Sequence, residues 1–170
     1  MRTRHTVIAS PLGELTLVAN RDALTGLYFR HHWHRPASDS LGSYVEHTSD
    51  ALLAGAAGQL HEYLAGERTR FDLPIALVGE SRQRRLWELL PNVAYGETTT
   101  YGELAAQLAD GTTAYEVDQT VGRNPLSIVV PCHRVVGKSG ALTGYAGGLK
   151  RKRFLLDLET PVAAAAGRLF

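Results

Sequence analysis

Apolar and polar residues alternate near the start of the chain, which is the pattern of half-buried β-strands. Glu14–Val18 carries this alternation, Thr6–Ala9 is apolar and β-prone, and Leu24–Phe29 resembles a third strand. The turn-forming residues Ser10–Gly13 separate the first two strands along the chain. The pattern predicts a meander of about three antiparallel strands.

The apolar spacing then changes to a helical period. The apolar residues that share one face of the predicted helix are Leu52, Ala56, Leu60, Tyr63 and Leu64. Gly66 ends this helix, and Phe71–Val78 is expected to be extended. Pro74 favours an edge strand or a linker there, so we place a domain boundary after residue 76.

The second half of the chain predicts short helices. Ser81 is expected to cap a helix that runs to about Leu90. Two more helices begin at capping boxes, in which a threonine precedes a glutamate by three residues. These boxes are Thr100–Glu103, with a helix through Leu108, and Thr113–Glu116, with a helix to about Val121. The turn Asp110–Gly111 between them indicates a helix-turn-helix.

The apolar run Leu126–Val130 predicts a buried strand that ends at Pro131 and delivers Cys132 to a defined point. Residues 137–148 are rich in glycine and are expected to form loops. A last helix is expected from about Leu149 to Leu158.

These elements predict an α+β fold with two domains. The N-terminal domain, residues 1–76, is expected to hold a small antiparallel sheet with a helix. The C-terminal domain, residues 77–160, is expected to be mainly helical, and residues 161–170 to form a loose tail.

Composition and charge limit the possible functions. The chain has 170 residues and a formal net charge of +1, so nucleic-acid binding requires a local patch. The single cysteine excludes an internal disulfide and a cysteine-rich metal site, and it favours a reducing, cytoplasmic setting. No apolar run is long enough for a membrane helix, and no secretory signal is evident, so we expect no membrane association.

Three histidines lie close together in His31–Pro36. No carboxylate or cysteine completes a familiar metal-ligand spacing around them. We interpret this segment as a solvated loop and expect neither a metal nor a cofactor.

Cys132 and His133 are adjacent and form the main candidate for chemistry. A thiol attacks only as its thiolate, and a neighbouring imidazole can remove its proton. A carboxylate that orients the imidazole completes such a set, and Glu159 is the candidate. The pattern alone leaves an alternative open, because a lone cysteine is often a small buried apolar residue and adjacent side chains often point apart.

A longer set of motifs is more specific. It comprises Ser10–Gly13, Tyr95–Tyr101, Asn124–Pro125, Pro131–Val135 and Leu142–Leu149. With these motifs the chain resembles the O6-alkylguanine-DNA alkyltransferases over roughly residues 5 to 160. The resemblance implies a ribonuclease H-like N-terminal domain and a winged helix-turn-helix-type C-terminal domain that carries the cysteine. It also implies DNA repair by direct reversal, in which guanine in double-stranded DNA is flipped out and its O6-alkyl group passes irreversibly to the cysteine.

The resemblance implies roles for individual residues. Cys132 is the alkyl acceptor, and His133 acts through a water as its base while Glu159 orients the imidazole. Asn124 braces the turn that joins the recognition helix to the active-site segment. Tyr101 protonates the guanine as it leaves.

Further residues are implied around this centre. Lys152 helps to polarise one corner of the pocket, although Lys150–Arg153 also fits a solvated face. Tyr101 also fits a core aromatic residue, and Glu159 a surface carboxylate. The residues expected to bind the flipped base are Tyr145, Ala146, Gly147 and Gly148, with backbone carbonyls at Cys132 and at Val135 or Val136. The residues expected to bind DNA are Thr113, Ala114, Tyr115, Gln119, Arg123 and Arg134.

The predicted recognition helix departs from the family pattern. The family sequence resembles Ala-Arg-Ala-Val-Gly, whereas this chain has Tyr115 at the arginine position and Asp118 at the glycine position, with Glu116 between them. Additional carboxylates near phosphates predict weaker binding to duplex DNA, although Glu116 also completes a capping box. Tyr115 retains the capacity to fill the gap left by a flipped base.

Two other functions compete with repair of duplex DNA. A damage-sensing DNA-binding protein without chemistry is one, but relatives of that kind lack the cysteine. An alkyl acceptor for free O6-alkylguanine is the other, and the altered helix favours it. The preferred alkyl group stays open, and we expect a monomer.

Overall fold

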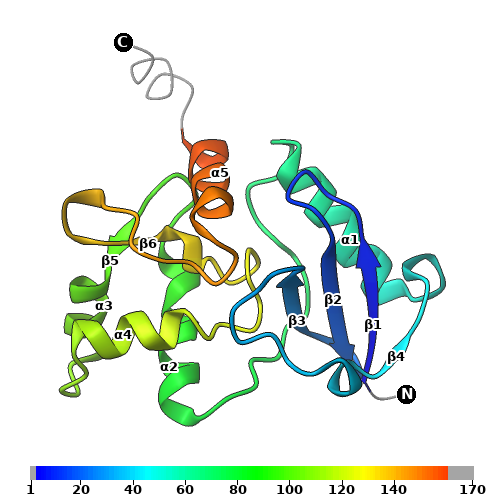
Figure 1. Ribbon diagram of the computed structural model, residues 1–170, viewed down its shortest axis with the longest axis horizontal. Coiled ribbons are helices and arrows are strands. Elements are labelled where there is room, and N and C mark those ends of the chain that lie inside the picture. Colours follow the sequence, from blue (N-terminus) through cyan, green and yellow to red (C-terminus); the bar gives the residue numbers. More distant parts are fainter. Residues whose placement is uncertain (1–2, 161–170) are drawn as a thin grey trace.

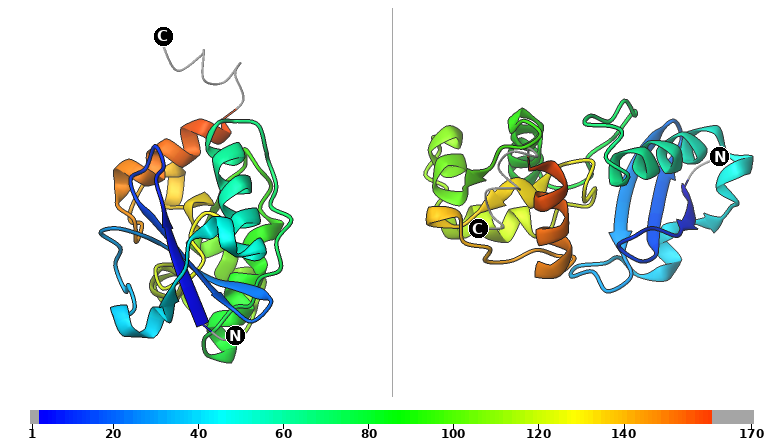
Figure 2. Two further views of the ribbon diagram at one scale, coloured as in Figure 1. Left: turned by 90° about the vertical axis from the view of Figure 1, so that its right-hand side faces the viewer. Right: turned by 90° about the horizontal axis from the view of Figure 1, so that it is seen from above.

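The computed structural model describes residues 3–160, so the tail expected at 161–170 lies outside the described residues. The chain forms two lobes that lie side by side (Figure 1). The N-terminal lobe contains the larger sheet, and the C-terminal lobe is mainly helical, as the view from above also shows (Figure 2). The predicted α+β class is confirmed.

The N-terminal sheet has the strand order β3-β2-β1-β4. Its strands are β1 (Thr3–Ile8), β2 (Leu15–Asn20), β3 (Ala23–Phe29) and β4 (Ser43–Tyr44). The first three strands form the predicted antiparallel meander. The short β4 pairs in parallel with β1, so the expectation of a purely antiparallel sheet was wrong at this edge. Parallel pairing requires that the chain return to the end of the sheet where β1 begins, and the connection from β3 to β4 is long enough for this.

Helix α1 (Ala51–Leu64) packs against this sheet. It begins at Asp50, whose carboxylate accepts a hydrogen bond from the backbone N–H of Leu53 at 3.1 Å. Arg4 of β1 donates to the same carboxylate at 2.6 Å, which joins the start of the helix to the sheet. The buried face of α1 carries Leu53, Ala56, Ala57, Leu60, Tyr63 and Leu64. Full burial of each leucine contributes roughly 1.5–3 kcal/mol.

The linker between the lobes follows β3 without forming a named strand. The backbone N–H of Leu24 donates to the carbonyl of Pro74 at 2.8 Å, and that of Ala76 donates to Leu24 at 3.0 Å. These two bonds form an isolated β-bridge between Leu24 and Ile75, and within residues 3–160 the linker forms no longer strand. Of the two alternatives that Pro74 allowed, the structure shows the extended linker.

The C-terminal lobe contains α2 (Ser81–Leu89), α3 (Tyr101–Leu108), α4 (Ala114–Val121) and α5 (Leu149–Glu159). Two short strands, β5 (Thr99–Thr100) and β6 (Val135–Val136), pair in parallel. This lobe also has short 3-10 helices at Leu90–Asn92, Cys132–Arg134 and Lys138–Gly140. Two others, Ser38–Leu41 and His47–Ser49, belong to the N-terminal lobe. The helices α3 and α4 are in contact and form the predicted helix-turn-helix.

The helix starts refine the sequence predictions. Glu80, and not Ser81, caps α2, because the Glu80 side chain forms a reciprocal capping box with Gln83. The capping box of α4 is present as predicted, with Thr113 and Glu116 bonded to each other's backbone N–H groups at 3.1 and 3.0 Å. At α3 the predicted capping box is incomplete: the N–H of Glu103 donates to the Thr100 hydroxyl, but the Glu103 carboxylate accepts from that hydroxyl and not from the Thr100 backbone N–H.

The segment Leu126–Val130 is buried, but the prediction of a strand there was wrong. Ile128 has a φ of 72°, and the N–H of Val130 turns back to the carbonyl of Leu126 at 2.9 Å. Asn124 supplies the partners that a sheet would have provided. Because the Asn124 side chain bonds backbone groups that a neighbouring strand would otherwise bond, this apolar segment can turn without belonging to a sheet.

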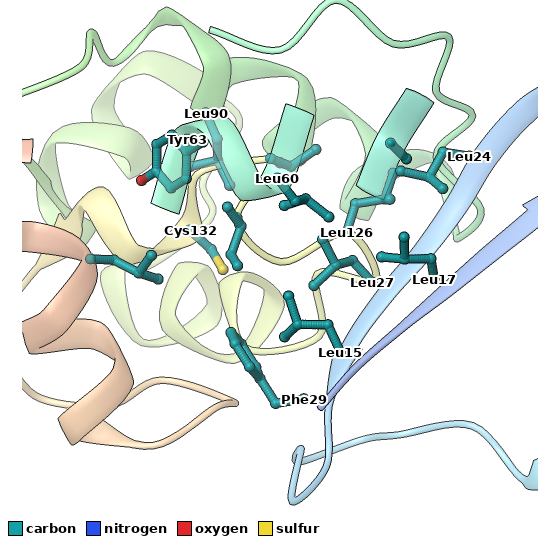
Figure 3. Close-up of a cluster of buried hydrophobic side chains, with 14 of the residues drawn as sticks. Leu15, Leu17, Leu24, Leu27, Phe29, Leu60, Tyr63, Leu90, Leu126 and Cys132 are labelled. Atoms are coloured by element: carbon teal, nitrogen blue, oxygen red, sulfur yellow. The ribbon is translucent and has the colours of Figure 1, made fainter. Parts of the chain in front are cut away.

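The hydrophobic core is shared between the two lobes. Leu15, Leu27 and Phe29 of the sheet pack in one cluster with Leu126 and Cys132 of the C-terminal lobe (Figure 3). The N–H of Leu27 also donates to the carbonyl of Pro125 at 2.8 Å. The cysteine therefore lies where the sheet of one lobe supports the active-site turn of the other.

Candidate active site

Cys132 lies in the 3-10 helix Cys132–Arg134, at the wall of a cavity of about 130 Å³. The thiol side chain is 3% exposed, so its neighbours control access to it. The residues that line the cavity are Trp33, His34, Tyr101, Asp118, Gln119, Val121, Gly122, Cys132, Thr143, Gly144, Tyr145 and Ala146. Both lobes, the helix-turn-helix and the glycine-rich loop therefore contribute to one site.

Asn124 holds the turn that leads to the cysteine. Its side-chain N–H₂ donates to the carbonyl of Val130 at 2.9 Å, and its oxygen accepts from the N–H of Leu126 at 3.0 Å. Burial raises the pKa of the Cys132 thiol, while a hydrogen bond from Asn124 and the charge of Lys152 act in the opposite direction. A buried thiol with a raised pKa requires a base before it can attack.

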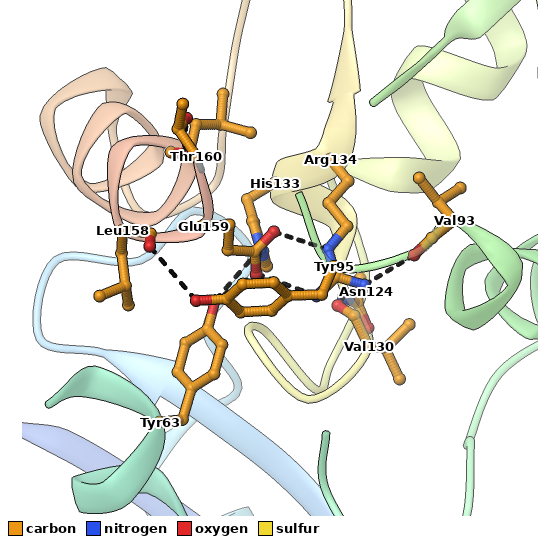
Figure 4. A network of polar contacts seen from close by, with 11 residues as sticks. Tyr63, Val93, Tyr95, Asn124, Val130, His133, Arg134, Leu158, Glu159 and Thr160 are labelled. Carbon is orange, nitrogen blue, oxygen red and sulfur yellow. Dashed lines mark hydrogen bonds and ion pairs between the residues drawn. The ribbon is translucent and has the colours of Figure 1, made fainter. Parts of the chain in front are cut away.

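His133, which follows Cys132 in the chain, forms a buried pair with Glu159 (Figure 4). Nε2 of His133 lies 2.8 Å from Oε2 of Glu159. Burial lowers the pKa of His133, so the ring is neutral and donates its Nε2 proton to the carboxylate. Nδ1 is buried and has no hydrogen-bond partner among residues 3–160, so it is the nitrogen that can accept a proton.

Three donors hold Glu159 as a carboxylate. Burial alone would raise its pKa, but hydrogen bonds from His133, Arg134 and Tyr63 outweigh this effect and hold the pKa at about 2. Arg134 donates to both oxygens, at 2.8 and 2.9 Å, and the Tyr63 hydroxyl donates to Oε2. Glu159 is 3% exposed, so the surface alternative does not apply.

The position of Arg134 corrects one prediction. It was expected to bind DNA, but it is 8% exposed and bonds inward to Glu159 and to the carbonyl of Val93 at 2.7 Å. Its guanidinium also lies over the ring of Tyr95, 5.8 Å from the centroid. Three of its N–H groups are bound inside the protein, where they orient the carboxylate, and its burial keeps the guanidinium away from a phosphate at the surface.

Tyr63 is a functional candidate that the sequence did not reveal. Its place on the apolar face of α1 predicted a core residue, and its ring is indeed buried. Its hydroxyl nevertheless reaches across the lobes to the His133–Glu159 pair (Figure 4). A buried tyrosine hydroxyl usually needs a polar partner, which is the one general signal available in the sequence.

Lys152 is buried within the site and does not belong to a solvated face. It is 1% exposed, and its Nζ donates to the carbonyls of Val135 at 2.7 Å and Gly144 at 2.9 Å. Burial lowers its pKa to about 8. The two hydrogen bonds tie α5 to β6 and to the glycine-rich loop.

Tyr101 lies at the start of α3 and lines the cavity. Its hydroxyl accepts a hydrogen bond from Thr143 at 3.2 Å, and burial raises its pKa. It is therefore protonated at neutral pH and can act as a donor inside the cavity.

The glycine-rich loop packs closely against the N-terminal lobe. A Cβ added at Gly147 would lie 2.4 Å from the ring of Phe29, and Gly148 has a φ of 93°. Tyr145 is buried against the same ring, with centroids 5.8 Å apart. The loop thus forms a fixed wall of the cavity. Ala146 lines it, together with Tyr145.

Comparisons with known proteins match both lobes. Residues 3–77 match the ribonuclease-like domain of 6-O-methylguanine DNA methyltransferase, and residues 81–161 match its DNA-binding domain. Methylated-DNA–protein-cysteine methyltransferase from Mycobacterium bovis is 43% identical over 167 residues, which cover 98% of each chain. This chain belongs to the 6-O-methylguanine DNA methyltransferase family.

Further relatives of the methyltransferase agree. The constitutive methylated-DNA–protein-cysteine methyltransferase of Bacillus subtilis is 39% identical over 160 residues, covering 91% of this chain and 94% of the relative. The crystal structure of Mycobacterium tuberculosis OGT in complex with DNA has a TM-score of 0.82 and 40% identity. That alignment covers 95% of this chain and 98% of the other.

Helix α4 of this methyltransferase presents a polar outer face with few cations. Five of the residues expected to bind DNA are exposed on α4 or beside it: Thr113, Ala114, Tyr115, Gln119 and Arg123. Tyr115 is 71% exposed. Asp118 and Gln119 also line the cavity that holds Cys132.

The histidine-rich segment is the predicted loop, in which His31 and His34 are exposed and His32 packs inward. His32 stacks on Phe29 with centroids 5.7 Å apart, and burial and the charges of Arg35 and Arg151 lower its pKa to about 4. Within residues 3–160 no group of histidines, cysteines and acidic residues is placed to hold a metal ion. In the same part of the chain no helix has the length and apolar character for a membrane crossing.

Proposed function

We propose that this protein repairs alkylated DNA by direct reversal, with Cys132 as the acceptor of an alkyl group from O6 of guanine. One observation carries the proposal: a buried cysteine at a cavity wall stands next to a histidine that a carboxylate orients at 2.8 Å. The same cavity is bounded by the second helix of a helix-turn-helix. Nucleophilic chemistry and a DNA-reading element therefore meet at one site.

The transfer uses two proton movements, one that activates the thiol and one that neutralises the leaving guanine. Nδ1 of His133 accepts the thiol proton through a water, while Nε2 keeps its proton on Glu159. The Cys132 thiolate then attacks the alkyl carbon, a C–S bond forms, and the electron pair of the C–O6 bond goes to guanine. Tyr101 donates a proton so that guanine leaves as a neutral base, an effect worth about 10²–10⁴-fold.

The product explains why each molecule reacts once. A thioether forms at Cys132, and a thiolate is a poor leaving group from saturated carbon. The nucleophile is thus consumed, and no second cysteine exists in the chain to take its place.

Lys152 and the loop position the substrate in this scheme. The cation stands near the sulfur and favours the thiolate. Tyr145, Ala146, Gly147 and Gly148 wall the flipped base. The carbonyls of Cys132 and of Val135 or Val136 are the candidates for the guanine amino group, because a carbonyl that already accepts one hydrogen bond, as Val135 does from Lys152, has a second lone pair.

A second candidate function is favoured by Asp118. Its carboxylate lines the cavity, and no arginine stands at position 115 to contact the duplex. Such a site accepts free O6-alkylguanine without a penalty from phosphates, whereas double-stranded DNA meets an extra negative charge. The proposal is thus an intact acceptor with a weakened preference for duplex DNA.

Intact-mass measurement tests both candidates. The protein is incubated with duplex DNA that carries one O6-methylguanine, and separately with O6-benzylguanine, beside a Cys132→Ala control. A single methyl group from the duplex, absent in the control, supports DNA repair. Labelling by O6-benzylguanine alone supports the second candidate, and labelling by neither refutes the acceptor role.

We also propose a monomer that works in the cytoplasm. The reducing compartment follows from the chemistry, because the one thiol must stay reduced to react. Sedimentation of the purified protein with and without duplex DNA tests the monomer, since a dimer would sediment faster before any DNA is added.

A further inference from the structure

An exposed indole stands at the active-site cavity. Trp33, in the loop after β3, is 61% exposed and lines the same cavity as Cys132. Among the described residues it belongs to neither buried apolar cluster. A single exposed aromatic residue is common on a protein surface, so the significance of Trp33 lies in its place in the lining of the cavity that holds Cys132.

The backbone that carries this indole is held in place. The N–H of Trp33 donates to the carbonyl of Ala146 at 2.9 Å, which joins the loop to the opposite lobe. Arg35 donates to the carbonyl of Phe29 at 3.0 Å, and His32 stacks on the ring of Phe29. The indole is therefore presented to the cavity by an ordered loop, which lowers the entropy cost of a contact with a ligand.

The opposite lobe fixes the same position. The guanidinium of Arg151 lies over the Phe29 ring, 4.9 Å from its centroid, and donates to the carbonyl of Gly147 at 2.9 Å. Gly147 admits no Cβ because of Phe29. The loop after β3 and the glycine-rich loop are thus locked together, and the side chain of Trp33 is the part that remains free to meet a substrate.

We propose that Trp33 is a substrate-binding residue whose indole stacks on the purine ring of O6-alkylguanine in the cavity. This inference rests on the proposed function and extends it, because the N-terminal lobe then supplies part of the base-binding wall. Stacking requires only a π-face, so an indole binds the purine whatever the O6 substituent is. The carboxylate of Asp118 and the amide of Gln119 lie on the α4 side of the same cavity and supply polar contacts there.

Transfer kinetics test the contact. Rates are measured at sub-saturating concentration with O6-benzylguanine and with a duplex that carries O6-methylguanine, for the wild type, Trp33→Ala and Trp33→Phe. We expect Trp33→Ala to slow both reactions about tenfold, the loss of one stacking contact, and Trp33→Phe to recover most of the rate. Tyr44→Ala removes another exposed aromatic residue of the same lobe, outside the cavity, and is expected to change neither rate.

Fluorescence gives a second readout that does not depend on transfer. The chain has two tryptophans, and Trp87 is 2% exposed. In Cys132→Ala, which binds without reacting, we expect O6-benzylguanine to quench the emission of Trp33, and we expect no quenching when Trp33→Phe is added.

The outcomes separate this inference from the proposed function. If the wild type transfers no alkyl group, the proposed function fails. If the wild type reacts and Trp33→Ala reacts equally fast with O6-benzylguanine, only the stacking contact is overturned. A loss confined to the duplex also overturns it, because the indole would then contact DNA outside the flipped base.

Discussion

The carboxylate of Asp118 and the hydroxyl of Tyr101 line one cavity, and the charge of Asp118 adds to the burial that raises the pKa of Tyr101. The same charge acts to raise the pKa of Lys152, against the larger opposite effect of burial. The residue that departs from the family pattern therefore acts on the reaction site as well as on the approach of DNA.

Asp118→Asn should increase the rate of transfer from duplex DNA. The change removes one negative charge near the incoming phosphates and lowers the repulsion around the flipped nucleotide, so we expect a gain of about three- to tenfold at low salt. Single-turnover rates at two salt concentrations measure it, and the gain should shrink at high salt. Asp22→Asn, an exposed carboxylate in the β2–β3 turn, is the control. Equal rates for Asp118→Asn and wild type would refute the electrostatic role.

Glu159→Gln should abolish most of the transfer activity and destabilise the fold. The amide leaves the buried Arg134 without its counter-charge, and breaking a buried ion pair costs about 3–5 kcal/mol. The imidazole of His133 also loses its orientation, so we expect a rate at least about 100-fold lower. Chemical denaturation and intact-mass kinetics measure the two effects. A normal rate in a folded variant would contradict the role of Glu159.

The pH dependence of stability follows from the same carboxylate. Glu159 has a pKa of about 2 in the fold, against 4.5 ordinarily, so its stabilisation is present above pH 4.5 and is lost as the pH falls towards 2. Denaturation at several acidic pH values should show this loss in the wild type. In Glu159→Gln the slope of stability against pH in that interval should be smaller. An unchanged slope would show that Glu159 is not the source of the loss.

Lys152→Met should destabilise the protein and slow transfer. The variant leaves the buried carbonyls of Val135 and Gly144 without their donor, at about 1–3 kcal/mol for each unsatisfied group. Lys150→Met, on the exposed side of the same helix, is the matched control and should leave the melting temperature unchanged. Similar melting temperatures for the two variants would show that the buried hydrogen bonds contribute nothing.

Gly147→Ala should displace the loop that walls the cavity. The added Cβ would lie 2.4 Å from the Phe29 ring, and overpacking of this kind costs about 1–3 kcal/mol. Transfer from O6-benzylguanine should slow because Ala146 and Tyr145 move with the loop. Gly58→Ala, in α1 and outside the cavity, is the control, since an added Cβ there meets nothing within 4 Å. Equal rates for both variants would refute a fixed wall.

Local sequence determined much of this protein. Alternation predicted the meander, capping boxes and turn residues predicted α3 and α4, and the motif around Cys132 pointed to the acceptor chemistry, because each is a property of neighbouring residues. The apolar run Leu126–Val130 was wrongly predicted to be a strand. A short buried run has the same apolar pattern whether a sheet or a side chain such as that of Asn124 satisfies its backbone groups.

Only the tertiary structure decided which side chains meet at the cysteine. Tyr63 and Glu159 are 96 positions apart, and their contact arises because α1 of one lobe packs against α5 and the active-site turn of the other. Arg134 turned inward and Asp118 turned into the cavity for the same reason: packing between distant elements sets the direction of a side chain. A sequence pattern carries the period of one element but not the position of its neighbour.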